Sequence, residues 1–521
     1  MKNVKLLIGI IVGAAVYRFL MWNETLGLNA FIFAVLITGA VFAYKQELRR
    51  YRLLWTLAGA FVVSAAGVAI TGIVFSHTIY YLTLIVFLAF VQMPSLRSPW
   101  CALLLLPYHS AIAIWMDINL LGNALSELFG KRPKKPLRTR VRWWQVAIIS
   151  MAAIVFIWLF SVANPQFAEI IRQVWQALWD AVAWVIPDLS FLEIVHYLFV
   201  MYFLSLFVLR FKPTIISKED ERTSDHLHRI RHRQYFPYLQ TGLKSEYHTV
   251  IAGILVISAL LLTLNVIDIV SVWIAIAPES APELSQFVHR STYALMVSVI
   301  FSISILLFCF RKNLNFYPRN RLLKVTAYSW IGQNVFLLCS TGLRNWHYVS
   351  EYGLTYRRIG VFIFLLMVCV SLLLIFLKIR KRRTLYHFFR MNIFGALGVL
   401  VIAGLVNWDL LIASYNTSHI EKETDYAYLE RLSYQTAPYI LHATRKAFDE
   451  AFDKDADENI DGKYRFDNYW YSQQVYKYVQ EVDARSWKSF TVGDACTVRK
   501  LKAKPFASPN TAPFTDRQPT D

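Results

Sequence analysis

Residues 358–390 read RIGVFIFLLMVCVSLLLIFLKIRKRRTLYHFFR. The run from Ile359 to Leu377 carries no charged residue, and in helical form it is long enough to cross a hydrocarbon core about 30 Å thick. A cluster of Lys and Arg follows the run at once, which is typical of the cytoplasmic end of a membrane helix. The stretch therefore predicts a membrane-spanning helix.

The same pattern recurs along most of the chain of 521 residues. With 56% apolar and 17% charged residues, the composition differs from that of soluble proteins, in which about a quarter of the residues are charged. We predict an all-α fold, a polytopic transmembrane helical bundle with about eleven crossings. The predicted crossings are 4–22, 27–44, 54–75, 78–94, 145–163, 191–211, 249–268, 291–310, 325–342, 358–378 and 391–413.

The formal net charge of +19 is concentrated in the loops on one side of these crossings. Residues 131–142 read KRPKKPLRTRVR and residues 311–324 read RKNLNFYPRNRLLK, whereas residues 417–521 contain 15 Lys and Arg against 17 Asp and Glu. Basic loops face the cytoplasm, so we expect a cytoplasmic amino terminus and a carboxyl-terminal segment on the outside. The excess charge favours contact with anionic headgroups of membrane lipids, and we predict no nucleic-acid partner.

Two further segments are predicted to lie in or on the membrane without crossing it. Residues 99–129 are apolar enough to span, but Pro107 and Asp117 interrupt them, and a crossing would place the basic 131–142 loop outside. We therefore predict one re-entrant or interfacial segment, with a real crossing as the alternative. Residues 166–185 have apolar side chains at helical spacing with tryptophans at the margin, which predicts an amphipathic helix on the outer surface.

The composition changes after the last predicted crossing. Residues 421–482 are rich in charged residues and Tyr, with apolar residues at helical intervals, and prolines collect after residue 502. We predict N-terminal membrane helices over 1–144, a core membrane bundle over 145–414, a small helical extramembrane domain over 415–501 and a disordered tail over 502–521.

No motif of a known chemistry is present in the sequence. It lacks the P-loop, GxGxxG, GxSxG and HExxH patterns, and its five cysteines have no spacing that suits a metal. We therefore predict no catalytic residue, no metal site and no cofactor.

Polar residues at membrane depth are the first candidates for function, because they are unfavourable there unless they are paired or line water. Gln333 and Asn334 lie in the middle of the 325–342 segment, and His289 and Arg290 open the 291–310 segment. We interpret these side chains as interhelical hydrogen-bonding groups or interface anchors. A role in transport would require several of them to converge.

The stretch TGLRNWHYVSEYGLTYRR (341–358) is predicted to face outward between two crossings. It places Arg344 and Arg358 on the side where few cations are expected, and a guanidinium group suits a carboxylate or a phosphate. We predict that one of the two pairs with Asp409, with an anionic ligand as the alternative. Gly353 is predicted to provide a left-handed turn, and Thr355 to cap the following helix.

Three stretches carry a resemblance to a known family: FVHRSTYALMVSVI (287–300), WIGQNVFLLCSTGLRNWHYVSEYGLTYRRI (330–359) and VNWDLLIASYN (406–416). They resemble the motif core of the bacterial polytopic membrane family called domain of unknown function 4173, and DYAYLERLSYQTAPYIL (425–441) continues the likeness. The resemblance supports the topology and implies a location in the bacterial inner membrane, but it brings no activity. It implies that the motif positions are His289, Arg290, Gln333, Asn334, Arg344, Tyr352, Gly353, Leu354, Thr355, Arg358, Asn407, Asp409 and Asn416.

Three classes of function are compatible with these observations. We expect first a non-enzymatic envelope protein that serves as scaffold, sensor or assembly partner, with an unidentified protein partner. The second is a permease-like protein that binds or moves a small anionic or lipidic solute, and the third is a membrane enzyme acting on lipid-linked substrates. A deep polar cavity would favour transport, a filled bundle would favour the scaffold, and an outer cleft joining Arg344, Arg358, Asp409 and a His would favour the enzyme.

Overall fold

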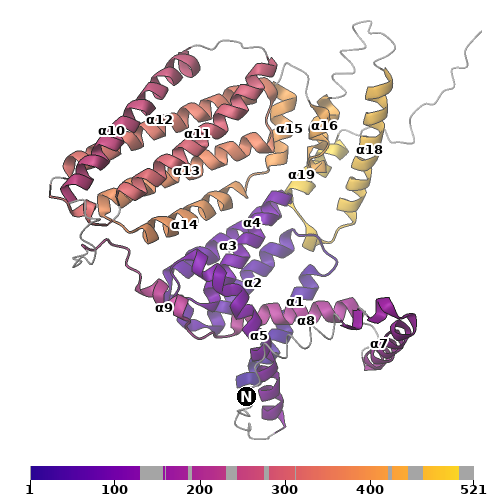
Figure 1. Cartoon of the computed structure of the whole chain (residues 1–521). Helices are drawn as coiled ribbons and strands as arrows, with labels where there is room; N and C mark the ends of the chain where they lie inside the picture. The colour runs from indigo at the N-terminus through magenta and orange to yellow at the C-terminus, as the bar shows by residue number, and fades with distance from the viewer. Residues whose placement is uncertain are drawn as a thin grey trace, which may run out of the picture. The chain divides into compact units, whose positions relative to one another are not determined.

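The computed structural model describes residues 2–129, 156–158, 160–185, 191–229, 243–274, 281–310, 312–318, 320–419, 425–443 and 461–503. Within these ranges every regular element is a helix, as predicted (Figure 1). The chain divides into two compact units, Met1–Trp22 with Leu105–Phe211 and Asn23–Leu104 with Lys212–Asp521. We describe each unit by itself.

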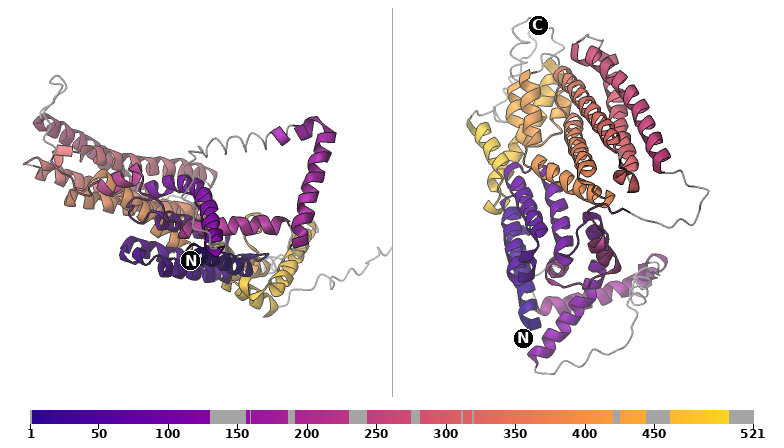
Figure 2. Two further views of the ribbon diagram at one scale, coloured as in Figure 1. Left: turned by 90° about the horizontal axis from the view of Figure 1, so that it is seen from below. Right: turned by 90° about the vertical axis from the view of Figure 1, so that its left-hand side faces the viewer.

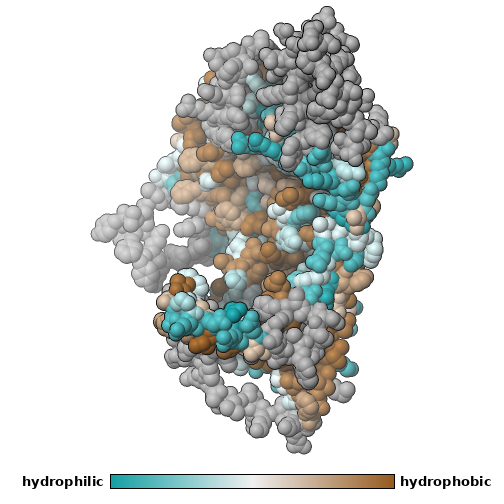
Figure 3. Space-filling model, turned by 90° about the vertical axis from the view of Figure 1, so that its right-hand side faces the viewer, coloured by the Kyte–Doolittle hydropathy of each residue, from teal (hydrophilic) through white to brown (hydrophobic). Residues whose placement is uncertain are grey.

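Among the described residues, seven helices are long and apolar enough to cross a membrane, which indicates a multi-pass membrane protein. They are α1 (Lys2–Met21), α3 (Arg52–Thr71), α4 (Val74–Gln92), α5 (Pro99–Leu128), α10 (Leu243–Asp268) with the π-helix η3 (Ile269–Ile274), α13 (Tyr356–Lys381) and α14 (Leu385–Ala403). Shorter apolar helices occur in α2 (Leu28–Tyr44), α8 (Phe191–Val208) and α11 (Ala281–Cys309). Figure 3 shows a broad band of apolar side chains on one face of the molecule, as expected for contact with lipid.

Several of the predicted crossings differ from the observed helices. The predicted 145–163 crossing lies mostly outside the described residues. The 325–342 crossing is part of a longer and less apolar helix, α12 (Arg321–Tyr352). The prediction of one helix over 391–413 is wrong, because α14 ends at Ala403 and a second helix, α15 (Trp408–His419), begins after a short break.

The segment 99–129 also differs from the prediction. It forms one continuous helix, α5, with Pro107 inside it, so the re-entrant form is wrong. The length and composition of α5 agree with the alternative that the segment crosses the membrane. The second special segment is the helix α7 (Pro165–Val185), as predicted, and its position on the outer surface stays a prediction.

The unit formed by residues 1–22 and 105–211 is held together by polar contacts between apolar helices. Arg18 of α1 pairs with Glu193 of α8 at 3.2 Å, and its guanidinium lies 5.2 Å from the ring centre of Tyr197. The Ser205 hydroxyl of α8 donates a hydrogen bond to Asp117 of α5 at 2.7 Å. These contacts give buried or half-buried polar groups a partner in an apolar setting, where an unpaired polar group is unfavourable.

The second unit begins with a group formed by α2, α3 and α4, against which α14 packs. Its centre is aromatic, since the buried ring of Phe61 stacks on Tyr80 and Phe87 at centroid distances of 5.5 and 5.6 Å. The hydroxyls of Ser64 and Thr83 join α3 to α4 at 2.6 Å. The short helix η1 (Gln46–Arg50) connects α2 to α3; two further short helices of this unit are α9 (Ile215–Arg222) and η4 (Lys312–Phe316), which packs on α10.

Helices α10, α11, α12 and α13 of the same unit lie side by side (Figure 1, Figure 2). Their apolar core surrounds Trp330 of α12, which is completely buried, and includes Leu337, Leu372 and Ile375. The bundle is therefore filled by side chains along this part of its length.

A C-terminal helical segment packs on the ends of the membrane helices in this unit. It consists of α16 (Tyr426–Leu429), η5 (Tyr434–Thr436), α18 (Asp461–Ala484), η6 (Trp487–Ser489) and α19 (Val492–Ala503). Its apolar core joins Leu429, Ile440 and Val475 to Ile412 of α15 and Val349 of α12. Residues 504–521, which make up most of the predicted tail, lie outside the described residues.

Candidate functional site

The turn between α12 and α13 is set by two local signals. Gly353 follows α12 with φ 79° and ψ 175°, a conformation that a side chain would strain, and its N–H bonds the Val349 carbonyl at 2.8 Å. Thr355 is the N-cap of α13, because its hydroxyl accepts from the Arg358 N–H at 3.5 Å. The predicted cap at Thr355 is confirmed. Gly353 has the predicted positive φ, but its ψ of 175° places it outside the left-handed helical region.

Arg358 caps the end of α12. Its Nη1 group donates to the carbonyl oxygens of Tyr352, at 2.6 Å, and of Gly353. The guanidinium also lies 4.1 Å from the ring centre of Tyr348. A cation at the carboxyl end of a helix is stabilised by the helix dipole and by the carbonyl groups left without partners there. The charge of Arg358 is thus used to end a helix.

Asn416 of α15 holds the same turn through a two-bond clamp. Its Oδ1 accepts from the Leu354 N–H at 2.6 Å, and its Nδ2 donates to the Leu354 carbonyl at 3.0 Å. Both residues are buried. One amide side chain therefore satisfies both backbone groups of a residue that lies between two helices.

Asp409 links α13 to the C-terminal helical segment. Its Oδ1 accepts from the Tyr356 hydroxyl at 2.5 Å, and its Oδ2 accepts from the Ser433 N–H at 3.2 Å. The predicted pairing of Asp409 with Arg344 or Arg358 is wrong: Arg358 is directed to the end of α12, and Arg344 turns to Asp268 on another helix.

Gln435 is the centre of a buried joint between three parts of the chain. Its Oε1 accepts from the Nδ2 of Asn407, which precedes α15, at 2.6 Å. Its Nε2 donates to the Thr71 carbonyl at the end of α3 and to Asp494 of α19, both at 2.8 Å. A Cβ on Gly493 would lie 2.5 Å from the Gln435 Oε1, so only glycine allows this approach. We call these contacts the Gln435 joint.

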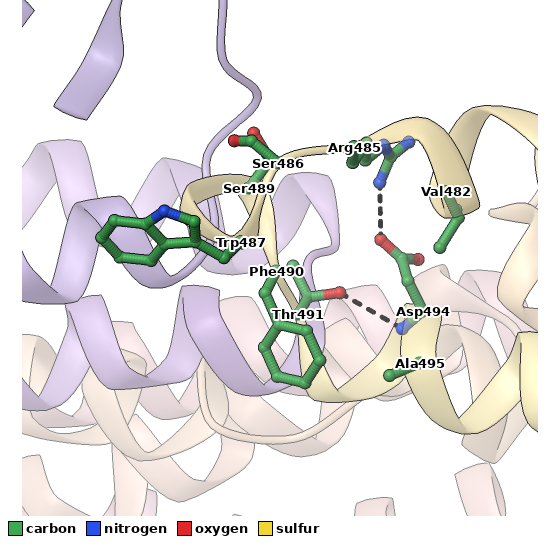
Figure 4. A pocket seen from close by; sticks show the side chains of 9 residues that line it. All are labelled: Val482, Arg485, Ser486, Trp487, Ser489, Phe490, Thr491, Asp494 and Ala495. Carbon is green, nitrogen blue, oxygen red and sulfur yellow. Dashed lines mark hydrogen bonds and ion pairs between the residues drawn. The ribbon is translucent and has the colours of Figure 1, made fainter. Parts of the chain in front are cut away.

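The Gln435 joint extends into a small cavity of about 100 Å³ in the C-terminal segment (Figure 4). Asp494 pairs there with Arg485 at 2.8 Å and accepts from the Tyr478 hydroxyl at 2.6 Å. Burial and the neighbouring Asp494 raise the pKa of Tyr478 above its usual value. Tyr478 therefore remains a hydrogen-bond donor throughout the physiological pH range.

A second attachment joins the loop before α2 to η6. Glu24 accepts from the hydroxyls of Ser486 and Ser489, both at 2.6 Å, and pairs with Lys488 at 3.0 Å. These hydrogen bonds and the Lys488 charge lower the pKa of Glu24 to about 2 against a small opposing effect of burial. Sequence reasoning missed Glu24, because an acidic residue in a short loop between two apolar helices needs no special explanation.

The geometry gathers eight of the predicted motif residues into one region of turns and helix ends: Tyr352, Gly353, Leu354, Thr355, Arg358, Asn407, Asp409 and Asn416. The family model described as "Domain of unknown function (DUF4153)" matches residues 6–443. The chain belongs to the DUF4153 family. The resemblance to domain of unknown function 4173 is not confirmed. No curated protein and no solved structure matches the chain.

The intramembrane candidates of this DUF4153 chain lie apart from the turn region, along the seam of α10 and α12. Arg344 pairs with Asp268, a fully buried carboxylate at the point where α10 becomes the π-helix η3. The Asn265 amide donates to the Gln333 carbonyl at 3.2 Å, and the Asn334 amide to the Trp330 carbonyl of its own helix. Asn334 is fully buried and is therefore part of the helix packing. The contact at Gln333 is made by its backbone carbonyl, so the role of the Gln333 side chain stays a prediction.

His289 and Arg290 lie in the first half of α11, and their side chains lie outside the described residues. Their predicted roles stay predictions.

Proposed function

We propose that this DUF4153 protein is a non-enzymatic membrane scaffold that holds its C-terminal helical segment in a fixed position for an envelope partner protein. The Gln435 joint carries this proposal. Gln435 is only 2% exposed, and its amide contacts Asn407, Thr71 and Asp494. One side chain thus fastens the C-terminal segment to the end of α3 and to the turn between α14 and α15.

The joint resists displacement for an energetic reason. A buried amide that loses one partner leaves at least one polar group without a hydrogen bond, which costs about 1–3 kcal/mol. Sliding of the segment would break the contacts of Gln435 with Asn407 and Thr71 together and would also separate Glu24 from Ser486 and Ser489. A segment fastened at both places keeps one orientation, as a scaffold or assembly partner requires.

The segment also presents a surface suited to a protein partner. Its exposed large side chains include Trp487, Phe490 and Tyr476, with exposed fractions of 55%, 46% and 51%. Aromatic residues of this kind provide most of the binding energy in many protein interfaces. We place the partner contact at Trp487 and Phe490, next to the attachment of Glu24.

The positions of the basic clusters support an outward orientation of the segment in a bacterial inner membrane. Helix α3 begins after the basic η1 and ends at Thr71 in the Gln435 joint, and α14 begins after Arg382 and Arg383 and leads to α15 at the same joint. Because basic ends face the cytoplasm, the joint belongs to the opposite side.

A lipidic solute carrier is the second candidate, and one cleft favours it. The cleft has a volume of about 650 Å³ and is lined by residues of α12, α13 and α15, among them Trp346, Phe362 and Leu411. Its walls are mostly apolar, and the nearby Arg358 is directed to the end of α12. The cleft suits a hydrocarbon chain better than an anion.

Photo-crosslinking in intact cells tests the scaffold. A photoreactive residue at position 487 should give one discrete protein adduct, and Gln435→Leu should reduce that adduct at least tenfold without lowering the amount of protein in the membrane. Gln474→Leu, the same exchange at a half-buried position of α18, is the matched control and should leave the adduct unchanged. An adduct that survives Gln435→Leu, or the lack of any adduct in the unmodified chain, would contradict the proposal.

A further inference from the structure

A second cleft lies between the first half of α3 and residues 390–398 of α14, and it includes arginine side chains. It has a volume of about 590 Å³, within the range of about 300–1,000 Å³ typical of sites for small molecules. Apolar side chains line most of it, including Leu57 and Ala60 of α3 and Phe394 and Leu397 of α14. Two arginines, Arg97 and Arg390, complete the lining.

The packing of the two helices explains why this space is open. Near their other ends α3 and α14 approach closely, since a Cβ on Gly67 would lie 2.8 Å from the Gly404 carbonyl oxygen. Gly398 belongs to the cleft lining, and a Cβ there would meet nothing within 4 Å. A chain of carbon atoms could therefore lie against the α14 backbone at Gly398.

The two arginines are held as a pair. The Nη2 atoms of Arg97 and Arg390 contact the Oδ2 of Asp225 at 2.5 and 3.0 Å. Both guanidiniums also lie beside the Tyr386 ring, at 5.9 and 5.4 Å from its centre. Burial alone would raise the pKa of Asp225, but the hydrogen bond and charge of Arg390 and the charge of Arg97 outweigh it and lower the pKa. Asp225 thus stays ionised and keeps both arginines in place.

The arginine pair retains the capacity to bind a second anion. A guanidinium has five N–H donors in a planar fork, and Asp225 contacts one terminal nitrogen of each arginine. Arg50 and Arg52 are exposed next to Leu53, which also lines the cleft. Arg97 also donates from its Nη1 to the Thr223 carbonyl at 2.9 Å, and its backbone N–H bonds the buried Asp220 at 2.6 Å. The four arginines at this end outnumber the carboxylates of Asp225 and Asp220, so the mouth of the cleft is electropositive.

We propose that this cleft binds an anionic phospholipid, with the phosphate at Arg97 and Arg390 and an acyl chain along Leu57 and Phe394. The apolar walls exclude a free phosphate as the natural occupant, because they offer it no hydrogen bonds. The paired arginines distinguish an anionic headgroup from a zwitterionic one, since each basic residue at the membrane surface adds about 1 kcal/mol for an anionic lipid. The site is independent of the Gln435 joint.

Native mass spectrometry of the full-length protein in detergent tests the proposal. The probes are phosphatidylglycerol and phosphatidylethanolamine with identical acyl chains, added in equal amounts. The protein should retain more phosphatidylglycerol than phosphatidylethanolamine. Arg97→Gln should weaken the binding of phosphatidylglycerol about fivefold and leave the binding of phosphatidylethanolamine unchanged. Arg390 still neutralises Asp225 in this variant, so the fold should survive.

A second variant tests the apolar part of the site. Gly398→Leu fills the cleft and should reduce the binding of both lipids, whereas Gly59→Leu is the matched control on an exposed face of α3, where a Cβ also meets nothing within 4 Å. Three results would each overturn the proposal. The protein could retain both lipids equally, Gly398→Leu could leave lipid binding unchanged, or millimolar inorganic phosphate could displace phosphatidylglycerol. If Arg97→Gln does not fold, the Gly398→Leu comparison decides.

Discussion

Replacement of Asn416 by Ala is expected to open the turn between α12 and α13. The change removes both hydrogen bonds to Leu354, at 2.6 and 3.0 Å, and leaves a buried N–H and a buried carbonyl without partners. At about 1–3 kcal/mol for each unsatisfied group, the local structure should lose about 3 kcal/mol. Since every 1.4 kcal/mol is a factor of about ten, amide hydrogens of the turn should exchange about 100-fold faster.

Hydrogen exchange with peptide resolution in detergent measures this effect on a peptide that covers 350–358. Ser418→Ala is the control, because the Ser418 hydroxyl is exposed on the same helix and bonds the Ser414 carbonyl at 2.6 Å. The exchange rate in Asn416→Asp should lie between those of the two variants. This side chain keeps the acceptor for the Leu354 N–H but loses the donor to the Leu354 carbonyl. If the exchange rate in Asn416→Ala is within about twofold of the rate in Ser418→Ala, the reasoning is refuted. The backbone hydrogen bonds of the turn would then not depend on the Asn416 side chain.

Three further outcomes are expected. Gly353→Ala should destabilise the protein by about 1–2 kcal/mol and lower its melting temperature, because φ is 79° at this position. Gly360→Ala, on an exposed face of α13, is the control and should be neutral or stabilising. Equal shifts of the melting temperature in the two variants would contradict this prediction. Glu24 should hold η6 fully above about pH 4.3, the ordinary pKa of a Glu carboxyl, and the attachment should weaken as the pH falls towards about 2. The fluorescence of Trp487 in η6 measures this change, and Glu24→Gln should abolish its dependence on pH. Arg344→Gln and Asp268→Asn should each destabilise the protein by about 3 kcal/mol. The double variant should be destabilised by less than the sum of the two single effects. If the shifts of the melting temperature add up instead, the two residues are not a coupled pair.

Local features of this chain could be read from its sequence. Gly353 and Thr355 act on neighbouring backbone groups only, so YGLT was sufficient to predict both the turn and the cap. The apolar helices could be predicted for the same reason, since hydropathy is a local property. The break between α14 and α15 was missed because its residues, Gly404 to Asn407, interrupt an apolar run only weakly.

Contacts between distant residues could not be predicted in this way. The partner of Arg344 is Asp268, which is 76 residues away and stands at the end of an apolar run, and the contact depends on how α10 packs on α12. Asp225 lies in a basic segment between Arg222 and Arg229 and does not stand out in the sequence, yet it holds two arginines from different segments. An acidic residue inside a strongly basic loop was the available signal.

The motif residues of the turn region share one physical task, which explains their clustering without a ligand. Each lies at or beside an interruption of a membrane helix: Arg358 at the end of α12, Asn407 at the start of α15, and Asn416 against the residue between α12 and α13. Interrupted helices expose backbone groups that membranes cannot hydrate, and every such group needs a partner within the protein. Polar side chains bonded to the backbone meet that need, and the same bonds fasten the C-terminal segment to the helix ends. The positions that look most like a binding site in the sequence are therefore those that bond the backbone at these helix ends.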